Sequence, residues 1–219
     1  MKREIRSYVL RQGRTTPSQQ RALDELFPRF GIPFSNALLD PRQLFGRNAP
    51  LILEIGSGMG ETTAEIAQQN PAVDFIAIEV HGPGIGSLLK KIEALELKNL
   101  RLIRHDAVAV LESMIPDGLL AGIHLFFPDP WPKKRHHKRR LVQPPFAALA
   151  ARKLAPGGYF HAATDWPEYA VQMEEVLSSS ALFERETGEG RKRPVTKFER
   201  RGIGLGHPVR DLLFLRPKE

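Results

Sequence analysis

Short apolar stretches and amphipathic stretches alternate along the chain between residues 50 and 165. The apolar stretches, which predict buried strands, are Leu51 to Ile55, Phe75 to Glu79, Leu100 to Arg104, Ile123 to Phe127 and Gly158 to Ala163. The amphipathic stretches predict helices at Glu61 to Gln69, within Ile85 to Leu97, and at Leu141 to Leu154. Strands that alternate with helices are typical of a parallel sheet built from βαβ units. The pattern therefore predicts an α/β fold.

The chain that precedes this pattern has a different character. Residues 1–49 are rich in arginine and are interrupted by Pro17, Pro28, Pro33 and Pro41. We interpret them as a basic N-terminal extension with at most short helices, and we expect it to be partly flexible. Residues 50–219 form the second part, and the total length of 219 residues suits one domain with a sizeable core.

Composition narrows the class of protein. The chain has no cysteine, which excludes disulfides and any zinc or iron–sulfur site held by cysteine. His136 and His137 have no partners at metal-binding spacing, so we predict that the protein has no metal site. The longest mostly apolar run, Gly118 to Phe127, is about half of a membrane span. We expect a cytoplasmic protein with no membrane partner.

Positive charge is concentrated in three segments. Residues 1–14, 133–140 and 191–201 hold 17 of the 32 Lys and Arg residues but only Glu4 and Glu199 among the 25 acids. The rest of the chain is therefore acidic, although the formal net charge of the whole is +7. Localised basic segments on an acidic body predict a binding surface for nucleic acid.

One of these segments follows a distinctive loop. The predicted strand that ends at Phe127 leads into Asp129, and the loop is stiffened by Pro128, Pro130 and Pro132. Trp131 lies in the same loop, where it either stacks on a nucleotide base or closes the core behind the loop. Six Lys or Arg and two His then follow without interruption from residue 133 to residue 140. A carboxylate held beside such a run predicts both a reactive site and a polyanionic partner.

A glycine-rich loop joins the first predicted strand to its helix. Glu54 begins this loop, which contains Gly56, Gly58 and Gly60 and ends at Glu61. Glycine allows a ligand to approach the main chain closely. Carboxylates at Glu54 and Glu61 would repel a pyrophosphate at the start of the helix. The loop therefore favours a cofactor that has a cationic centre and no phosphate.

Acidic residues end the next two predicted strands. Glu79 is placed to accept hydrogen bonds from two ribose hydroxyls, although an ordinary acid at a strand end remains an alternative. Asp106 is placed to accept an adenine amino proton, and it is equally suited to capping a helix. Because open α/β sheets bind ligands at the carboxyl ends of their strands, the two acids predict one cofactor site.

The loop from Glu54 to Gly60, with Glu79 and Asp106, resembles the class I S-adenosylmethionine-dependent methyltransferases. The segment from Phe127 to Arg140, together with residues 196–199 and 206–207, resembles the bacterial tRNA (guanine-N7)-methyltransferase (TrmB) family, and the match runs from about residue 6 to residue 214. The resemblance implies a Rossmann-like methyltransferase domain at 50–219, with a mostly parallel seven-stranded sheet and helices on both faces.

The resemblance also implies an activity and a set of site residues. The activity is transfer of a methyl group from S-adenosylmethionine to N7 of guanosine 46 in the tRNA variable loop, with Asp129 as the active-site residue. The cofactor residues would be Glu54, Gly56, Gly58, Glu79, Asp106 and Asp129. The tRNA residues would be Lys133, Arg135, His136, His137, Lys138, Arg139, Arg140, Asp165, Thr196, Lys197, Phe198 and Glu199. Asp165 is equally suited to capping a helix that begins at Pro167.

Two other functions fit parts of the sequence. An NAD-type oxidoreductase would use the same fold, but Glu61 and the absence of a hydride-transfer motif disfavour it. A non-catalytic RNA-binding module would keep a degenerate cofactor pocket, but Glu54, Glu79 and Asp129 are intact. The sequence leaves open whether the protein is a monomer or a homodimer.

Overall fold

A twisted seven-stranded sheet forms the centre of the molecule, with strand order β3-β2-β1-β4-β5-β7-β6. The computed structural model describes residues 7–8, 13–179, 181–187, 193–196, 199 and 208–218. The strands are β1 (Leu51–Ile55), β2 (Asp74–Ile78), β3 (Leu100–Ile103), β4 (Leu120–Phe126), β5 (Leu154–Thr164), β6 (Glu184–Arg185) and β7 (Arg210–Leu215). Neighbours among β1 to β5 pair in parallel, whereas β7 pairs antiparallel with both β5 and β6. The predicted fold class is confirmed.

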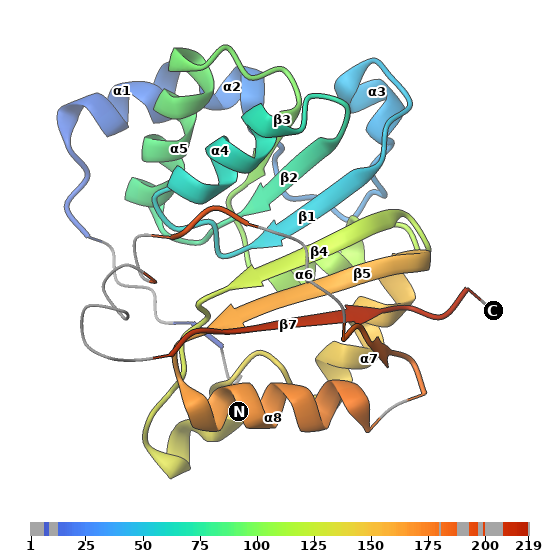
Figure 1. Ribbon diagram of the computed structural model, residues 1–219. Helices are drawn as coiled ribbons and strands as arrows, with labels where there is room; N and C mark the ends of the chain where they lie inside the picture. The colour runs from blue at the N-terminus through green and yellow to red at the C-terminus, as the bar shows by residue number, and fades with distance from the viewer. Residues whose placement is uncertain are drawn as a thin grey trace.

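Helices cover both faces of this sheet (Figure 1). They are α1 (Pro17–Glu25), α2 (Phe27–Phe30), α3 (Pro41–Phe45), α4 (Glu61–Gln69), α5 (Gly82–Ala94), α6 (Ala107–Ser113), α7 (Pro144–Lys153), α8 (Pro167–Ser178) and the 3-10 helix η1 (Lys134–Arg139). One apolar cluster joins α1, α4 and α5 to the sheet, and a second joins α6, α7 and α8 to it. Two separate cores on opposite faces leave the carboxyl ends of the strands open.

The segment before the sheet packs against the rest of the molecule. Ala22 and Leu26 are buried where α1 lies along α5. Farther along, Gly31 pairs with Leu102 of β3, and the Ile32 amide donates a hydrogen bond of 2.7 Å to the Leu102 carbonyl. Residues 13–49, which include three short helices, thus pack against α5 and the outer strand β3.

Two predicted boundaries differ from the structure. The helix expected within Ile85 to Leu97 is α5, which begins earlier, at Gly82, and ends at Ala94. A Cβ atom on Gly84 would lie 2.3 Å from the Gly58 carbonyl oxygen. The absence of a side chain at Gly84 therefore permits α5 to pack against the glycine-rich loop that follows β1. The strand expected at Gly158 to Ala163 is β5, which begins earlier, at Leu154. In this added part Gly157 has a φ of 76° and the pairing with β4 is irregular.

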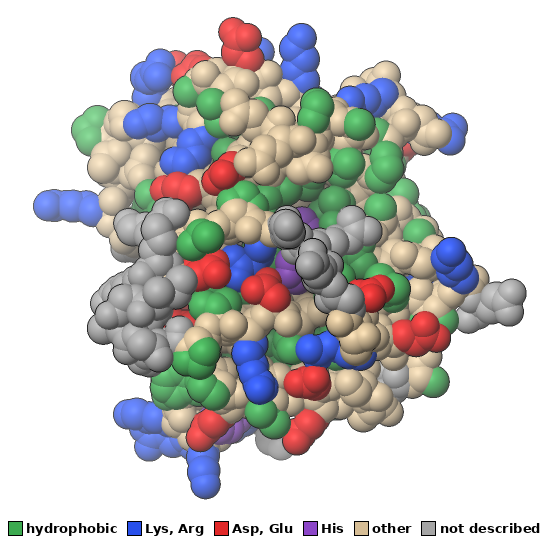
Figure 2. Space-filling view, viewed as in Figure 1, with side chains coloured by type: hydrophobic (Ala, Val, Ile, Leu, Met, Phe, Trp, Pro, Cys, Tyr) green, Lys and Arg blue, Asp and Glu red, His purple; other side chains and the backbone are tan. Residues whose placement is uncertain are grey.

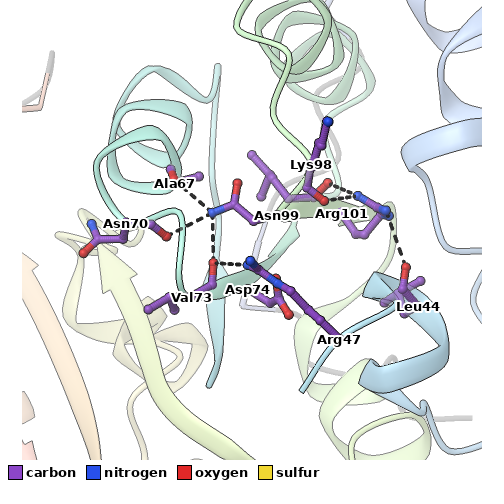
Figure 3. Close-up of polar contacts among 10 residues, drawn as sticks. Leu44, Arg47, Ala67, Asn70, Val73, Asp74, Lys98, Asn99 and Arg101 are labelled. Atoms are coloured by element: carbon purple, nitrogen blue, oxygen red, sulfur yellow. Dashed lines mark hydrogen bonds and ion pairs between the residues drawn. The ribbon is translucent and has the colours of Figure 1, made fainter. Parts of the chain in front are cut away.

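Buried polar contacts fix the amino ends of β2 and β3 (Figure 3). The Arg47 guanidinium donates to Asp74 with an N···O distance of 2.5 Å, and only 1% of the Asp74 side chain is exposed. The Asn99 amide nitrogen lies 2.9–3.1 Å from the carbonyl oxygens of Ala67, Asn70 and Val73. These contacts tie loops to the end of the sheet opposite the site. Among the described residues, no helix combines the length and apolarity needed to cross a membrane.

Candidate active site

The Asp129 loop leaves the end of β4 in an unusual backbone conformation. Phe127 and Trp131 have φ angles of 51° and 46°, a region that bulky side chains rarely adopt unless surrounding contacts impose it. The Phe127 amide donates to the Ala163 carbonyl at 2.8 Å, and the Trp131 indole nitrogen donates to the Ser7 carbonyl at 3.1 Å. Asp129 is therefore presented at the surface by a loop that is anchored on both sides.

Arg140, which was expected to bind RNA, provides a further anchor of the loop. Its side chain is buried and donates to the Pro130 carbonyl at 2.8 Å and to the Gln172 side chain at 2.6 Å. A third nitrogen lies 3.1 Å from His137. These partners hold the guanidinium inside the fold and not at the exposed surface of the basic run. The guanidinium holds Pro130 beside Asp129 instead.

The surroundings of Trp131 favour one of its two interpretations. The Arg139 guanidinium lies 3.7 Å from the centre of the indole ring, and the His136 ring meets the indole edge-on. Arg139 also donates to the Tyr8 carbonyl at 3.1 Å. One face of the indole is thus occupied by a cation, which favours a role in closing the loop over base stacking.

The remaining cations of the basic run are at the surface. Lys133, Lys134, Arg135 and Lys138 are all exposed. Desolvation and the neighbouring cations lower the pKa of His136, so this histidine holds a proton less readily than an ordinary imidazole. The exposed part of the run therefore consists of four cations on η1 and the residue before it.

A cavity of about 290 Å³ opens beside the Asp129 loop at the carboxyl ends of the strands. Four of the predicted cofactor residues line it, namely Gly56, Glu79, Asp106 and Asp129. A larger cleft of about 880 Å³ lies between α6 and α7, and the residues that it shares with the cavity are Ser7, Tyr8, Val80, His105, Asp106 and Leu141. Figure 2 shows acidic side chains beside Lys, Arg and His side chains in the middle of the view, and further Lys and Arg side chains that project from its outline.

Glu79 organises the glycine-rich loop. One carboxylate oxygen accepts from the Gly58 amide at 2.8 Å, and the other accepts from the Val80 and His81 amides at 2.7 and 2.9 Å. Three backbone donors fix the orientation of this carboxylate. Glu79 thus joins the loop after β1 to the end of β2, and it also faces the cavity.

Glu54 is buried beneath the same loop rather than in the cavity lining. One of its oxygens accepts from the Thr63 hydroxyl at 2.8 Å, and the other has no partner among the described residues. Burial raises the pKa of Glu54 to about 7, although the Thr63 hydrogen bond opposes this shift. A buried carboxylate with an unused oxygen is suited to a cationic ligand or an additional donor.

The glycines and acids together fit the expected cofactor. Gly56 and Gly58 have φ angles of 77° and 57°, and no atom lies within 4 Å of the position that a Cβ would occupy on either. The main chain is therefore open to close approach by a ligand. These open glycines lie beside the carboxylates of Glu79, Asp106 and Asp129, which line the cavity. The arrangement suits a molecule with a ribose and a positive charge, such as S-adenosylmethionine.

Asp106 has the capping role that the sequence left open. Its side chain accepts from the Ala109 amide at 3.0 Å, which makes it the N-cap of α6. Because Asp106 also lines the cavity, capping does not exclude contact with a ligand. Asp165, by contrast, does not cap α8, whose N-cap is Trp166. The capping interpretation of Asp165 is wrong.

Thr196 and Glu199 form a reciprocal pair of hydrogen bonds. The Glu199 amide donates to the Thr196 hydroxyl at 3.0 Å, and the Thr196 amide donates to the Glu199 carboxylate at 3.3 Å. This is a capping box, and its Thr-x-x-Glu spacing was a signal that the sequence analysis missed. The other two predicted residues of this stretch, Lys197 and Phe198, lie outside the described residues.

Comparison with known proteins agrees with the geometry. The family model described as a putative methyltransferase matches residues 48–212. A protein of Chromobacterium violaceum named tRNA (guanine-N(7)-)-methyltransferase is 58% identical over 98% of this chain and 97% of its own length. A protein of the same name from Nitrosomonas europaea is 57% identical over 97% of this chain and 96% of its own length.

The chain belongs to the tRNA (guanine-N7)-methyltransferase family. Solved structures agree on the fold: the 16S rRNA methyltransferase KamB has a TM-score of 0.58 at 18% identity and covers 82% of this chain and 94% of its own. A precorrin-6y C5,15-methyltransferase from Geobacter metallireducens has a TM-score of 0.54 at 13% identity, over 82% of this chain and 90% of its own. A member of the tRNA (guanine-N7)-methyltransferase family is an enzyme, so the cavity is a candidate active site.

This methyltransferase has a further cavity residue that the sequence patterns did not predict. His105 lines both the cavity and the cleft, and its ring stacks on Phe34 at a centroid distance of 3.7 Å. Its buried Nδ1 atom has no hydrogen-bond partner among the described residues. Its place directly before Asp106 at the end of β3 was the available signal. In the described part of the chain, no cluster of three or more His, Asp or Glu residues could hold a metal ion.

The buried carboxylate of this methyltransferase leads to a stability prediction. The folded pKa of Glu54, about 7, lies above the ordinary value of 4.5. The folded state therefore holds the proton more tightly, and stability falls as pH rises from about 4.5 to 7. Without ligand at pH 8, Glu54→Gln should raise the free energy of unfolding by about 1–3 kcal/mol, with little change at pH 4.5.

Urea unfolding of both proteins at the two pH values measures this difference. Glu65→Gln, which alters an exposed residue of α4, is the matched control and should change stability little. A Glu54→Gln protein that is less stable than wild type at pH 8 would contradict the conclusion that burial destabilises the charged Glu54 carboxylate.

Proposed function

We propose that this protein transfers the methyl group of S-adenosylmethionine to N7 of guanosine 46 in the variable loop of tRNA. The observation that carries the proposal is the Asp129 loop, which lines an acidic cavity and leads directly into the exposed cations of η1. The names of the relatives, which share more than half of their residues with this chain, support the same reaction.

Methyl transfer to guanine N7 requires alignment of the two reactants and needs no general base. Guanine N7 already carries a lone pair, so no proton has to be removed from the nucleophile. S-adenosylmethionine, when bound, supplies an electrophilic methyl group on a cationic sulfur. Positive charge moves from sulfur to the purine and is not created. The side chains therefore have to orient the two reactants and tolerate a cation throughout the reaction.

Asp129 is the residue that we assign to orienting guanine. A carboxylate can accept hydrogen bonds from N1 and N2 of guanine, which leaves the N7 edge free. Its loop is held by the Phe127 amide, by Arg140 through Pro130, and by Trp131. A carboxylate held in this way needs little reorganisation when positive charge develops on the base.

The acids around the cavity have separate roles toward the cofactor. We assign Glu79 to the ribose hydroxyls and Asp106 to the adenine amino group, because both line the cavity at strand ends. The unpaired oxygen of Glu54 favours a cationic ligand in the same site. Glu61, exposed at the start of α4, disfavours the pyrophosphate of NAD.

The partner that fits the exposed cations is tRNA. Phosphate contacts from η1 would bring the variable loop over Asp129, and Asp165 and the 196–199 stretch are the further substrate residues that we propose. Because tRNA is the substrate that we propose, we also propose that the enzyme acts in the cytoplasm. It would act as a monomer or a homodimer.

Incubation with tritiated S-adenosylmethionine and unmodified tRNA transcripts tests the proposal. Borohydride and aniline treatment cleaves RNA at N7-methylguanosine, so a single cleavage after position 46 is the expected result. The RNA-binding-module alternative predicts tRNA binding without label transfer. The oxidoreductase alternative predicts a calorimetric response to NAD and none to S-adenosylhomocysteine. Either outcome would overturn the proposal.

A further inference from the structure

A buried arginine joins three separate segments at the edge of the site. Arg193 donates two hydrogen bonds to Asp211 of β7, at 2.7 and 2.9 Å, and one to Glu199 at 2.5 Å. Only 6% of its side chain is exposed. In Figure 1 residues 193–196 cross over the carboxyl ends of the central strands. Burying a charged guanidinium costs desolvation free energy, even when it is fully paired. We therefore expect this arginine to order the residues that it pairs with.

The same guanidinium lies against the strand end that carries the Asp129 loop. Its central carbon is 5.4 Å from the ring centres of both Phe126 and Phe127. Phe126 ends β4, and Phe127 has the strained backbone described above. Although burial opposes it, hydrogen bonds to Asp211 and Glu199 raise the pKa of Arg193, so the cation is permanent.

Both carboxylate partners of Arg193 have other fixed contacts. The Glu199 carboxylate also accepts from the Thr196 amide in the capping box. Asp211 also lies 2.8 Å from the buried His161 ring of β5. Arg193 therefore connects the capping box directly to the sheet, and its contacts with Phe126 and Phe127 connect the same unit to the Asp129 loop.

We propose that Arg193 is a positioning residue that fixes residues 193–196 and Glu199 against the strand end carrying Asp129, so that both parts of the site meet the same guanosine in the correct relative position. The inference deepens the proposed function and rests on tRNA being the substrate. It assigns no contact between Arg193 and the reactants. The Arg193 side chain acts through Glu199 on one side and through Phe126 and Phe127 on the other.

A lysine cannot replace this arginine. The bidentate contact with Asp211 requires a planar fork, and the third bond to Glu199 leaves from a different nitrogen. Arg193→Lys keeps the charge and loses this geometry. We expect the single-turnover rate of methyl transfer to fall about 10- to 100-fold, the scale of a small misplacement of reacting groups.

Binding should survive the substitution, because the contacts proposed for phosphate and cofactor lie elsewhere. The dissociation constants of tRNA and of S-adenosylhomocysteine should stay within about threefold of wild type. Arg185→Lys is the matched control: Arg185 also pairs with a carboxylate, Glu174, and lies over the ring of Phe214, but on β6 away from the site. This control should keep its rate within about twofold.

The rate is compared per S-adenosylhomocysteine-binding molecule, which corrects for any unfolded fraction. A corrected rate for Arg193→Lys equal to that of Arg185→Lys would overturn the inference. So would a loss that appears only in the tRNA dissociation constant, because that result would make Arg193 a binding residue.

Hydrogen exchange tests, in the absence of substrate, whether Arg193 connects Thr196 and Glu199 to the Asp129 loop. Exchange of the amides of Thr196, Glu199 and Phe127 should accelerate together in Arg193→Lys and stay unchanged in Arg185→Lys. Independent behaviour of the two segments would refute the connection. Failure of wild-type protein to methylate tRNA would refute the proposed function instead, so the two failures can be told apart.

Discussion

Asp129→Asn should lower the single-turnover rate of methyl transfer to tRNA by a factor on the order of 100 or more. The carboxylate offers two acceptors to the N1 and N2 donors of guanine, whereas asparagine keeps one acceptor and turns an amino group toward a donor. The rate falls because the base loses both its orientation and the negative charge beside its developing cation. Rapid-quench measurement with saturating S-adenosylmethionine reads this rate directly.

The loop should keep its structure in this variant. Its anchors are the main chain of Phe127 and Pro130 and the side chain of Trp131, and the substitution alters none of them. The dissociation constant for S-adenosylhomocysteine should therefore change little. Asp24→Asn, on the exposed side of α1, is the matched control. An Asp129→Asn enzyme as fast as this control would remove Asp129 from the proposed mechanism.

Replacing the four exposed cations Lys133, Lys134, Arg135 and Lys138 with alanine should weaken tRNA binding strongly and reduce its dependence on salt. Each phosphate contact contributes about −0.7 to −0.9 to the slope of log binding constant against log salt concentration. The variant should therefore have a slope that is flatter by about two to four units. The loss should be similar for different tRNA sequences, because phosphate contacts do not read bases.

A variant with the same change in net charge is the control for this experiment. Arg29, Arg42, Lys90 and Lys98 are exposed cations away from the Asp129 loop, and their replacement should leave the slope nearly unchanged. Filter binding across a salt series measures both. If the η1 variant binds tRNA with an unaltered slope, the run is a solvated surface and the other two basic segments carry the contacts.

The site could be predicted where chemistry follows from position along a strand. Glu79, Asp106 and Asp129 follow parallel strands, and parallel strands end at the same edge, so their convergence on one cavity was predictable. The helix from Glu61 to Gln69 has the predicted bounds because glycine precedes it and Pro71 follows it closely.

The roles of the arginines could not be predicted in this way. Arg140 and Lys138 belong to the same basic run of the sequence. Only the Arg140 side chain points inward, toward Pro130 and toward Gln172 on α8. Arg193 finds its partner Asp211 across 18 positions of sequence. Whether a cation faces solvent or a buried carboxylate depends on tertiary contacts, and a local charge pattern does not contain them. The start of α5 was missed for a similar reason, since Gly84 is required by contact with Gly58.

The most direct test of the proposed reaction is methyl transfer to a tRNA that contains 7-deazaguanosine at position 46. This nucleoside keeps the N1 and N2 edge that Asp129 is proposed to bind, but carbon replaces the nitrogen at position 7. We expect unchanged binding of the modified tRNA and no incorporation of label, whereas the guanosine-46 tRNA of the same sequence should accept about one methyl group per molecule. Equal incorporation into both RNAs would contradict the proposed reaction.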